Sequence, residues 1–116
     1  MHELGLMQTA LEAALTEAQA HGATRISKIS LRVGEASGAD SEVLRMGFAA
    51  MIHNTLAAGA VLAIEPVPVQ CFCPTCQIEF FPTRADELYF ECPTCHRFDA
   101  HVRQGREICV GSVEVT

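Results

Sequence analysis

The sequence predicts an α/β fold in which a small mixed sheet carries two helices and a cysteine-rich lobe is inserted between two strands. Three observations predict it. Apolar residues repeat at helical spacing in two segments, three other segments have strand character, and four cysteines lie in two close pairs. With 116 residues, 49% of them hydrophobic, the chain is about one domain long and can bury a modest core.

The first helix is expected from Leu4 to Ala20, a stretch rich in alanine and therefore strong in helix propensity. His21-Gly22 follows it, and Gly22 can adopt the left-handed conformation that ends many helices. The apolar positions that share one predicted face are Leu4, Met7, Leu11, Leu15 and Ala18.

The second helix is expected to begin near Asp40, where Asp40 or Ser41 can cap free backbone amides and Glu42 suits the positive end of the helix. We expect it to end at Gly59. Its predicted core face consists of Leu44, Phe48, Met51, Ile52 and Thr55.

Three strands are expected in the same lobe. The first covers residues 28–33, where apolar and polar residues alternate, and Gly34 ends it. The second covers 61–69, but Pro66 and Pro68 cannot donate to a neighbouring strand, so it should lie at an edge or leave the sheet there. The third, 107–115, should return to the first lobe. The buried positions of the first strand are predicted to be Ile29, Leu31 and Val33.

This order of elements predicts two domains. Residues 1–70 together with 105–116 should form the α/β lobe, and residues 71–104 should form the inserted cysteine lobe. The order of the strands stays open.

A repeated tetrapeptide carries the strongest chemical signal in the chain. Cys73-Pro74-Thr75-Cys76 recurs as Cys92-Pro93-Thr94-Cys95 with fifteen residues between the two copies. Two Cys-x-x-Cys knuckles at this spacing can bring four thiolates to the corners of one tetrahedron, as structural zinc requires. Such a closed site leaves no position for water, so it stabilises a fold and does not catalyse. We therefore predict a zinc-ribbon-like lobe.

Alternatives to zinc depend on the remaining cysteines. All six could form a disulfide framework, but no secretory signal precedes them, which favours a reducing cytoplasm. A thiol redox module would instead have reactive knuckle thiols. Cys71 could compete as a ligand, His96 could replace a cysteine, and Cys109 is expected to be a small buried residue in an apolar run.

Charge and length exclude other classes of function. The formal net charge is −6, and no Lys/Arg cluster is present, so a nucleic-acid partner is not expected. No apolar stretch approaches the roughly 20 residues that a membrane-spanning helix needs. Phosphate-binding loops, nucleophile elbows and metalloprotease motifs are all missing, so we expect no enzyme.

The amino terminus, Met1-His2-Glu3, is a second candidate metal site. The terminal amine, backbone amide nitrogens and the His2 imidazole can chelate one ion, and nitrogen ligands in a plane suit Ni(II) or Cu(II). The alternative is a frayed, solvated terminus with no ligand role.

The whole chain resembles the HypA/HybF family of nickel-insertion accessory proteins. The matching motifs occur in the family's order and at the family's distances along the chain. They are Met1-His2-Glu3-Leu4, Val33-Gly34-Glu35, Asp40-Ser41, Phe48, the segment from Cys71 to Cys76, the segment from Cys92 to His96, and Ser112-Val113-Glu114-Val115.

The resemblance implies a nickel metallochaperone for [NiFe]-hydrogenase maturation. It implies Met1, His2 and Glu3 as nickel ligands and structural zinc on the four knuckle cysteines. The implied partners are a nickel-handling GTPase and the hydrogenase large-subunit precursor, with urease accessory proteins as further candidates. Asp40 matches an acidic position near the nickel site of relatives, although a helix cap is an equal expectation for it. The number of subunits stays open.

Overall fold

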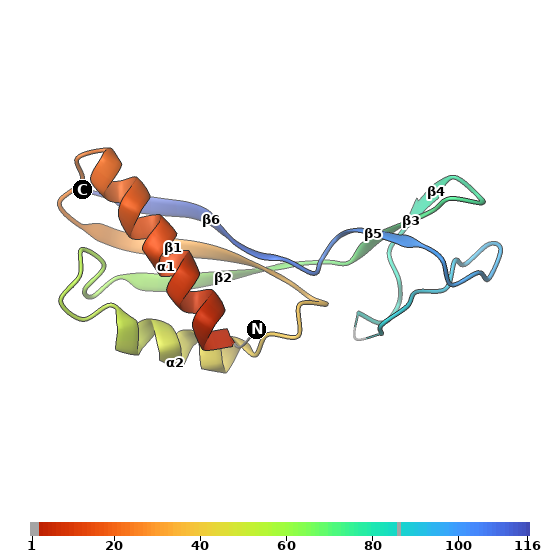
Figure 1. Cartoon of the computed structure of the whole chain (residues 1–116), viewed down its shortest axis with the longest axis horizontal. Coiled ribbons are helices and arrows are strands. Elements are labelled where there is room, and N and C mark those ends of the chain that lie inside the picture. The colour runs from red at the N-terminus through yellow and green to blue at the C-terminus, as the bar shows by residue number, and fades with distance from the viewer. Residues whose placement is uncertain (1–2, 86) are drawn as a thin grey trace. The chain divides into compact units, whose positions relative to one another are not determined.

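The computed structural model describes residues 3–85 and 87–116, and the predicted ligands Met1 and His2 lie outside this part. These described residues form two helices and six strands (Figure 1). Neither described helix combines the length and apolar character needed to cross a membrane. In chain order the elements are α1 (Glu3–Ala20), β1 (Ile26–Gly34), α2 (Ser41–Met51), β2 (Val61–Val67), β3 (Gln70–Cys73), β4 (Ile78–Phe80), β5 (His101–Gln104) and β6 (Ile108–Val115).

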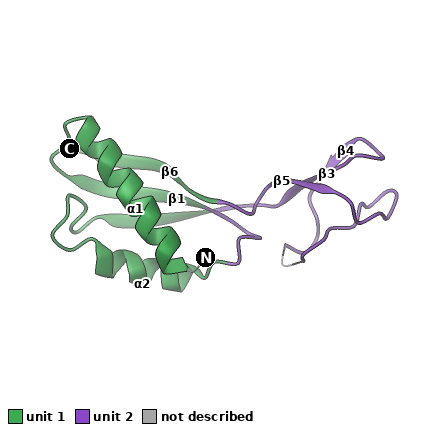
Figure 2. Cartoon of the chain, in the orientation of Figure 1, with its two compact units in different colours: residues 1–32, 39–65, 108–116 green, residues 33–38, 66–107 purple. Residues whose placement is uncertain are grey.

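The chain divides into two compact units (Figure 2). We call residues 1–32, 39–65 and 108–116 the helical unit, because both helices belong to it. Residues 33–38 and 66–107 form the cysteine unit, which contains both Cys-x-x-Cys knuckles.

The first sheet has the strand order β2-β1-β6. Strands β1 and β6 run antiparallel, since the Thr116 N–H donates to the Arg25 carbonyl over 2.9 Å at one end and the Gly34 N–H donates to the Glu107 carbonyl over 2.9 Å at the other. Strands β1 and β2 end together, where the Glu35 N–H donates to the carbonyl of residue 67 over 2.8 Å. They therefore run parallel with α2 as the crossover, and the predicted mixed sheet is confirmed.

Helix α1 packs against α2 and β6. Its buried residues are Met7, Leu11, Ala14 and Ala18. Leu4 was predicted on this face but is 45% exposed. A Cβ added at Gly47 of α2 would lie 2.6 Å from Leu4 Cδ2, so Leu4 contacts a residue that has no side chain to cover it. This explains why the first turn is less buried than the sequence pattern predicts.

Helix α2 ends earlier than predicted, at Met51 and not at Gly59. The chain turns because Asn54 adopts a left-handed conformation with φ 60°. The Thr55 hydroxyl donates to the Ile52 carbonyl over 2.7 Å, and its oxygen accepts the N–H of residue 57 over 3.0 Å. These local side-chain bonds replace the helical hydrogen bonds of the following turn.

The predicted strands occur with shifted ends. Strand β1 starts at Ile26, and Ile29, Leu31 and Val33 are buried as predicted. Strand β2 lies at a sheet edge, as its prolines predict, since an edge strand tolerates Pro66, which has no N–H to donate; the strand ends at Val67, before Pro68. Strand β6 returns beside β1, so the cysteine segment is inserted between two strands of one sheet.

The cysteine unit has a sheet of its own with the order β4-β3-β5, in which both neighbours run antiparallel to β3. The sequence analysis did not predict these three short strands. The buried core of the unit consists of Val69, Cys71, Cys73, Phe80, Phe90 and Cys92. Half of these six residues are cysteines, so the core contains few large apolar side chains.

Two glycines hold three segments of the cysteine unit together. A Cβ added at Gly34 would collide with the Gly105 carbonyl, and one added at Gly105 would lie 2.6 Å from the Cα of Val69. The Ala36 N–H donates to the Gly105 carbonyl over 2.7 Å. This close approach explains why residues 33–38, far from the cysteines in sequence, belong to the cysteine unit.

We expect Gly34→Ala to lower the free energy of unfolding by about 2 to 3 kcal/mol, because its Cβ would overpack against the Gly105 backbone, which cannot rotate away. The measurement is urea denaturation of the metal-loaded protein followed by circular dichroism. Gly38→Ala is the control, since Gly38 has φ +77° with no atom within 4 Å of an added Cβ. It should cost only about 1 kcal/mol of conformational strain. Equal losses for the two variants would contradict the role of close packing at Gly34.

Candidate metal centre

Four cysteine sulfurs converge in the cysteine unit. Cys73 ends β3, Cys76 lies in the turn before β4, and Cys92 and Cys95 precede β5. Their Sγ atoms all lie within 4.8 Å of one another, and within the described residues they form the one group of His, Cys, Asp or Glu able to hold a metal ion. The structure therefore brings together all four residues that the repeated tetrapeptide singled out.

The spacing of the sulfurs fits a tetrahedral ion. Cys73 Sγ lies 3.6 Å from Cys95 Sγ, and Cys92 Sγ lies 3.9 Å from Cys76 Sγ. Four sulfurs at about 2.3 Å from a central zinc ion are about 3.8 Å apart, so the cage already has the required size. A disulfide would need about 2.05 Å between sulfurs, and all four are free thiols.

The two knuckles have the same backbone geometry. Gln77 follows the first with φ 55°, and His96 follows the second with φ 64°. The Gln77 N–H donates to the Cys73 carbonyl over 2.8 Å, and the His96 N–H donates to the Cys92 carbonyl over 2.9 Å. The repeated sequence thus folds into a repeated turn that directs two sulfurs to the same point.

Backbone amides in these turns also polarise the sulfurs. The Cys76 N–H donates to Cys73 Sγ over 3.4 Å, and the Thr94 N–H donates to Cys92 Sγ over 3.4 Å. The pKa of the Cys92 thiol is lowered to about 6, first by the backbone N–H of Cys95 and also by that of Thr94. The pKa of Cys76 is raised to about 12, first by desolvation and then by hydrogen bonds with the other three sulfurs. Crowded thiols resist ionising together, so binding a cation here should release protons.

The other candidate ligands lie outside this cage. Cys71 is fully buried in the core of the unit, and burial raises the pKa of its thiol. His96 points its Nδ1 to Glu91 Oε2 at 3.0 Å on the exposed surface. Cys109 was predicted to be buried, and that prediction is wrong, because β6 is an edge strand and leaves this side chain exposed.

Of the predicted nickel ligands, Glu3 alone belongs to the described residues. It begins α1, and its Oε1 accepts the Asp40 N–H over 3.4 Å. The Asp40 carboxylate caps α2 by accepting the Glu42 N–H over 2.9 Å. The starts of the two helices therefore meet at Glu3 and Asp40. The sequence analysis missed this contact, since the two residues are far apart in the chain and no pattern pairs them.

Comparison with known proteins identifies the family. A family model described as "Hydrogenase/urease nickel incorporation, metallochaperone, hypA" matches residues 1–115. The chain belongs to the HypA family. As a member of this metallochaperone family it is not an enzyme, which agrees with the missing catalytic motifs.

Relatives match along almost the whole chain. A hydrogenase maturation factor HypA from Picosynechococcus is 37% identical over 115 residues, covering 99% of both chains. The HypA of Chloroflexus aurantiacus is 38% identical over 114 residues, covering 98% of both. The solution structure of the Ni metallochaperone HypA from Helicobacter pylori superposes with a TM-score of 0.75 at 25% identity, covering 99% of this chain and 97% of that one. The family resemblance seen in the sequence motifs is confirmed.

Substitutions next to a complete set of ligands typically weaken metal binding by roughly 10–100-fold. We expect Cys92→Ser to weaken metal binding in the cage by more than this, because it removes one of the four thiolates. Elemental analysis and competition with a colorimetric chelator measure this. Cys109→Ser removes an exposed thiol outside the cage and should bind as tightly as the parent. If the two variants bind metal equally, the four-sulfur assignment is wrong.

We expect Asp40→Ala to lower the free energy of unfolding by about 1 kcal/mol, because the Glu42 N–H loses its cap. Asp40→Ser should recover most of this loss, since a hydroxyl can accept the same bond. Thermal denaturation measures both variants. Asp99→Ala is the control, because it breaks an exposed ion pair with Arg97 that contributes about 0–1 kcal/mol. No recovery with serine would argue against a capping role.

Proposed function

We propose that this chain binds Ni(II) through Met1, His2 and Glu3 and delivers it for [NiFe]-hydrogenase maturation. The observation that carries the proposal is the family match from residue 1 onward, whose description names nickel incorporation. The ligand types support it as well, because an amine, an imidazole and backbone amide nitrogens suit Ni(II) in a plane. Nickel is the cargo of this site and not a permanent part of the fold.

The start of α1 favours this coordination. The first amides of a helix have no acceptor within it, so the Glu3 amide nitrogen can bind a metal without breaking a helical hydrogen bond. An amide that loses its proton to nickel becomes an anion, and the positive end of a helix dipole stabilises an anion. The neighbouring start of α2, held to Glu3 through the Asp40 N–H, adds a second positive helix end.

We further propose that the four-sulfur cage holds structural zinc. The distances between its sulfurs suit zinc, and four thiolates leave no open position for a substrate or water. Zinc would neutralise thiolates in a unit whose core contains Cys73 and Cys92. In this proposal the closed cage holds a zinc ion that stays with the protein, and the chain terminus holds a nickel ion that is transferred.

The partners we propose are a nickel-handling maturation GTPase and the hydrogenase large-subunit precursor, with urease accessory proteins as a further possibility. The family description, which names hydrogenase and urease, supports this. The chain has no phosphate-binding motif of its own, so any nucleotide-driven step would belong to a partner. The proposed compartment is the cytoplasm, where the six thiols would remain reduced.

The decisive experiment compares untagged parent protein with His2→Ala by nickel calorimetry. We expect about one Ni(II) per parent chain and at least a hundredfold weaker binding in His2→Ala, since the imidazole ligand is lost. His21→Ala is the matched control, because His21 is an exposed histidine that pairs with Glu17 and lies outside both sites. Zinc content, measured on the same samples, should be equal in all three.

Identical nickel isotherms for the parent and His2→Ala would remove the proposed terminal site. The chain would then be better described as a small metal-stabilised adaptor that binds only proteins. A peptide fused ahead of Met1 provides an independent check, because it converts the amine into an amide and should abolish nickel binding without changing zinc content.

A further inference from the structure

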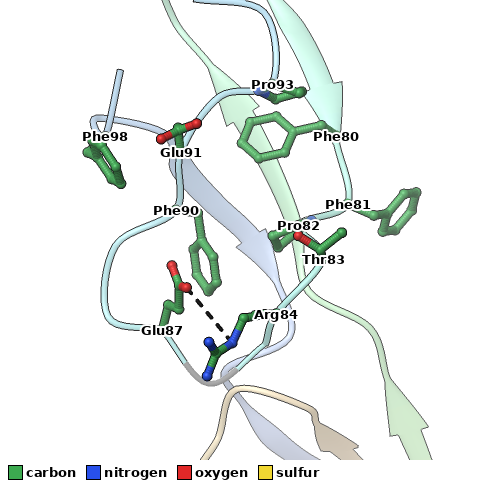
Figure 3. A pocket seen from close by; sticks show the side chains of 10 residues that line it. All are labelled: Phe80, Phe81, Pro82, Thr83, Arg84, Glu87, Phe90, Glu91, Pro93 and Phe98. Carbon is green, nitrogen blue, oxygen red and sulfur yellow. Dashed lines mark ion pairs between the residues drawn. The ribbon is translucent and has the colours of Figure 1, made fainter. Parts of the chain in front are cut away.

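The cysteine unit carries a concave pocket that neither metal site uses. Its volume is about 420 Å³, and Figure 3 labels the side chains that line it. Four phenylalanines contribute from three stretches of chain: Phe80 and Phe81 at the end of β4, Phe90 before the second knuckle, and Phe98 after it. We call this cavity the aromatic pocket.

The rings divide into a buried pair and an exposed pair. Phe80 and Phe90 are only 9% and 3% exposed, so they belong to the core of the unit. Phe81 and Phe98 are 63% and 57% exposed. Exposed aromatic rings beside a cavity are costly in water and are typical of surfaces that a protein partner covers.

The charges at the pocket are mainly acidic. Glu87 and Glu91 line it, and Arg84 Nε lies 4.0 Å from Glu87 Oε1, the outer limit of an ion pair (Figure 3). Over its whole sequence the cysteine unit has four basic and seven acidic residues, and four ligand thiolates would add to the negative side. This balance favours a positively charged occupant.

Aromatic rings in this unit already bind guanidinium groups. The Arg106 guanidinium carbon lies 5.7 Å from the centroid of Phe90, and that of Arg103 lies 4.6 Å from the centroid of Phe72. Cation–π contacts of this kind strengthen when water is excluded. The exposed rings at the aromatic pocket offer the same chemistry to a cation from outside the chain.

We propose that the aromatic pocket docks a segment of a partner protein that presents a lysine or arginine next to apolar residues. The cation would contact the rings and the carboxylates of Glu87 and Glu91, and the apolar neighbours would cover Phe81 and Phe98. A second copy of this chain fits less well, because each copy has a net charge of −6. Nucleic acid is disfavoured by the same charge.

The second knuckle forms part of this pocket. Pro93 of the second knuckle lines it, Glu91 precedes that knuckle and pairs with His96 at 3.0 Å, and Phe98 follows. Half of the residues that line the pocket therefore lie at or near the second knuckle, within residues 87–98, and the other half are residues 80–84. The inference does not depend on nickel binding at the amino terminus, and its test leaves that site intact.

The test selects random linear peptides displayed on phage against the metal-loaded, full-length protein. We expect enrichment of peptides that combine lysine or arginine with apolar residues. Affinity of one labelled selected peptide, measured by fluorescence anisotropy, should fall about tenfold with Phe98→Ala and about threefold with Glu87→Gln. Both substitutions change exposed side chains, and unchanged metal content verifies the fold. Nickel binding of Phe98→Ala should equal that of the parent.

Tyr89→Ala is the matched control, because Tyr89 is an aromatic of the same unit that is 66% exposed but does not line the pocket. It should bind the peptide as the parent does. Three outcomes would overturn the proposal: selection of acidic or uncharged peptides or of none, an equal loss of affinity with Tyr89→Ala, or a dimer of the parent that Phe98→Ala dissociates.

Discussion

The convergence of four sulfurs on one point is the constraint on which the cysteine unit depends. Cys73 and Cys92 of the cage also belong to the six-residue buried core of the unit. Three residues of that core are cysteines, and only the other three are larger apolar side chains. Desolvation first, and then hydrogen bonds with the other three sulfurs, raise the pKa of the Cys76 thiol, so the four thiols do not all ionise readily without a cation. A metal ion bound at the centre would stabilise the four thiolates together. It would also link the two knuckles, which the short strands alone would hold weakly.

The helical unit contains the start of the chain, where we propose the nickel site. Its sheet is completed by β6, which returns after the cysteine segment to pair with β1. This sheet supports α1 and α2, whose starts meet through Glu3 and Asp40. A closed sulfur cage exchanges its ion slowly, whereas ligands on a chain terminus can be replaced one at a time, which suits the proposed transfer of nickel to another protein.

Local patterns predicted much of this structure. The repeated tetrapeptide identified all four cage cysteines, because each knuckle is a local turn and the repeat requires the same turn twice. Alternation predicted the buried face of β1, and the two prolines predicted that β2 lies at an edge or leaves the sheet, of which the edge position is confirmed. Errors arose where a neighbour decides burial. Leu4 faces a glycine and Cys109 lies on an edge strand, so both are exposed despite their apolar surroundings in sequence.

The sequence by itself determined the helices and strands of the helical unit, the family and the four cysteines that converge, because each of these follows from short-range spacing or from motif order. Only the tertiary structure decided that residues 33–38 join the cysteine unit, that Glu3 bonds to Asp40, and that four phenylalanines surround one cavity. Those contacts join positions far apart in the chain, and they arise from close backbone approach and packing, which no local pattern encodes.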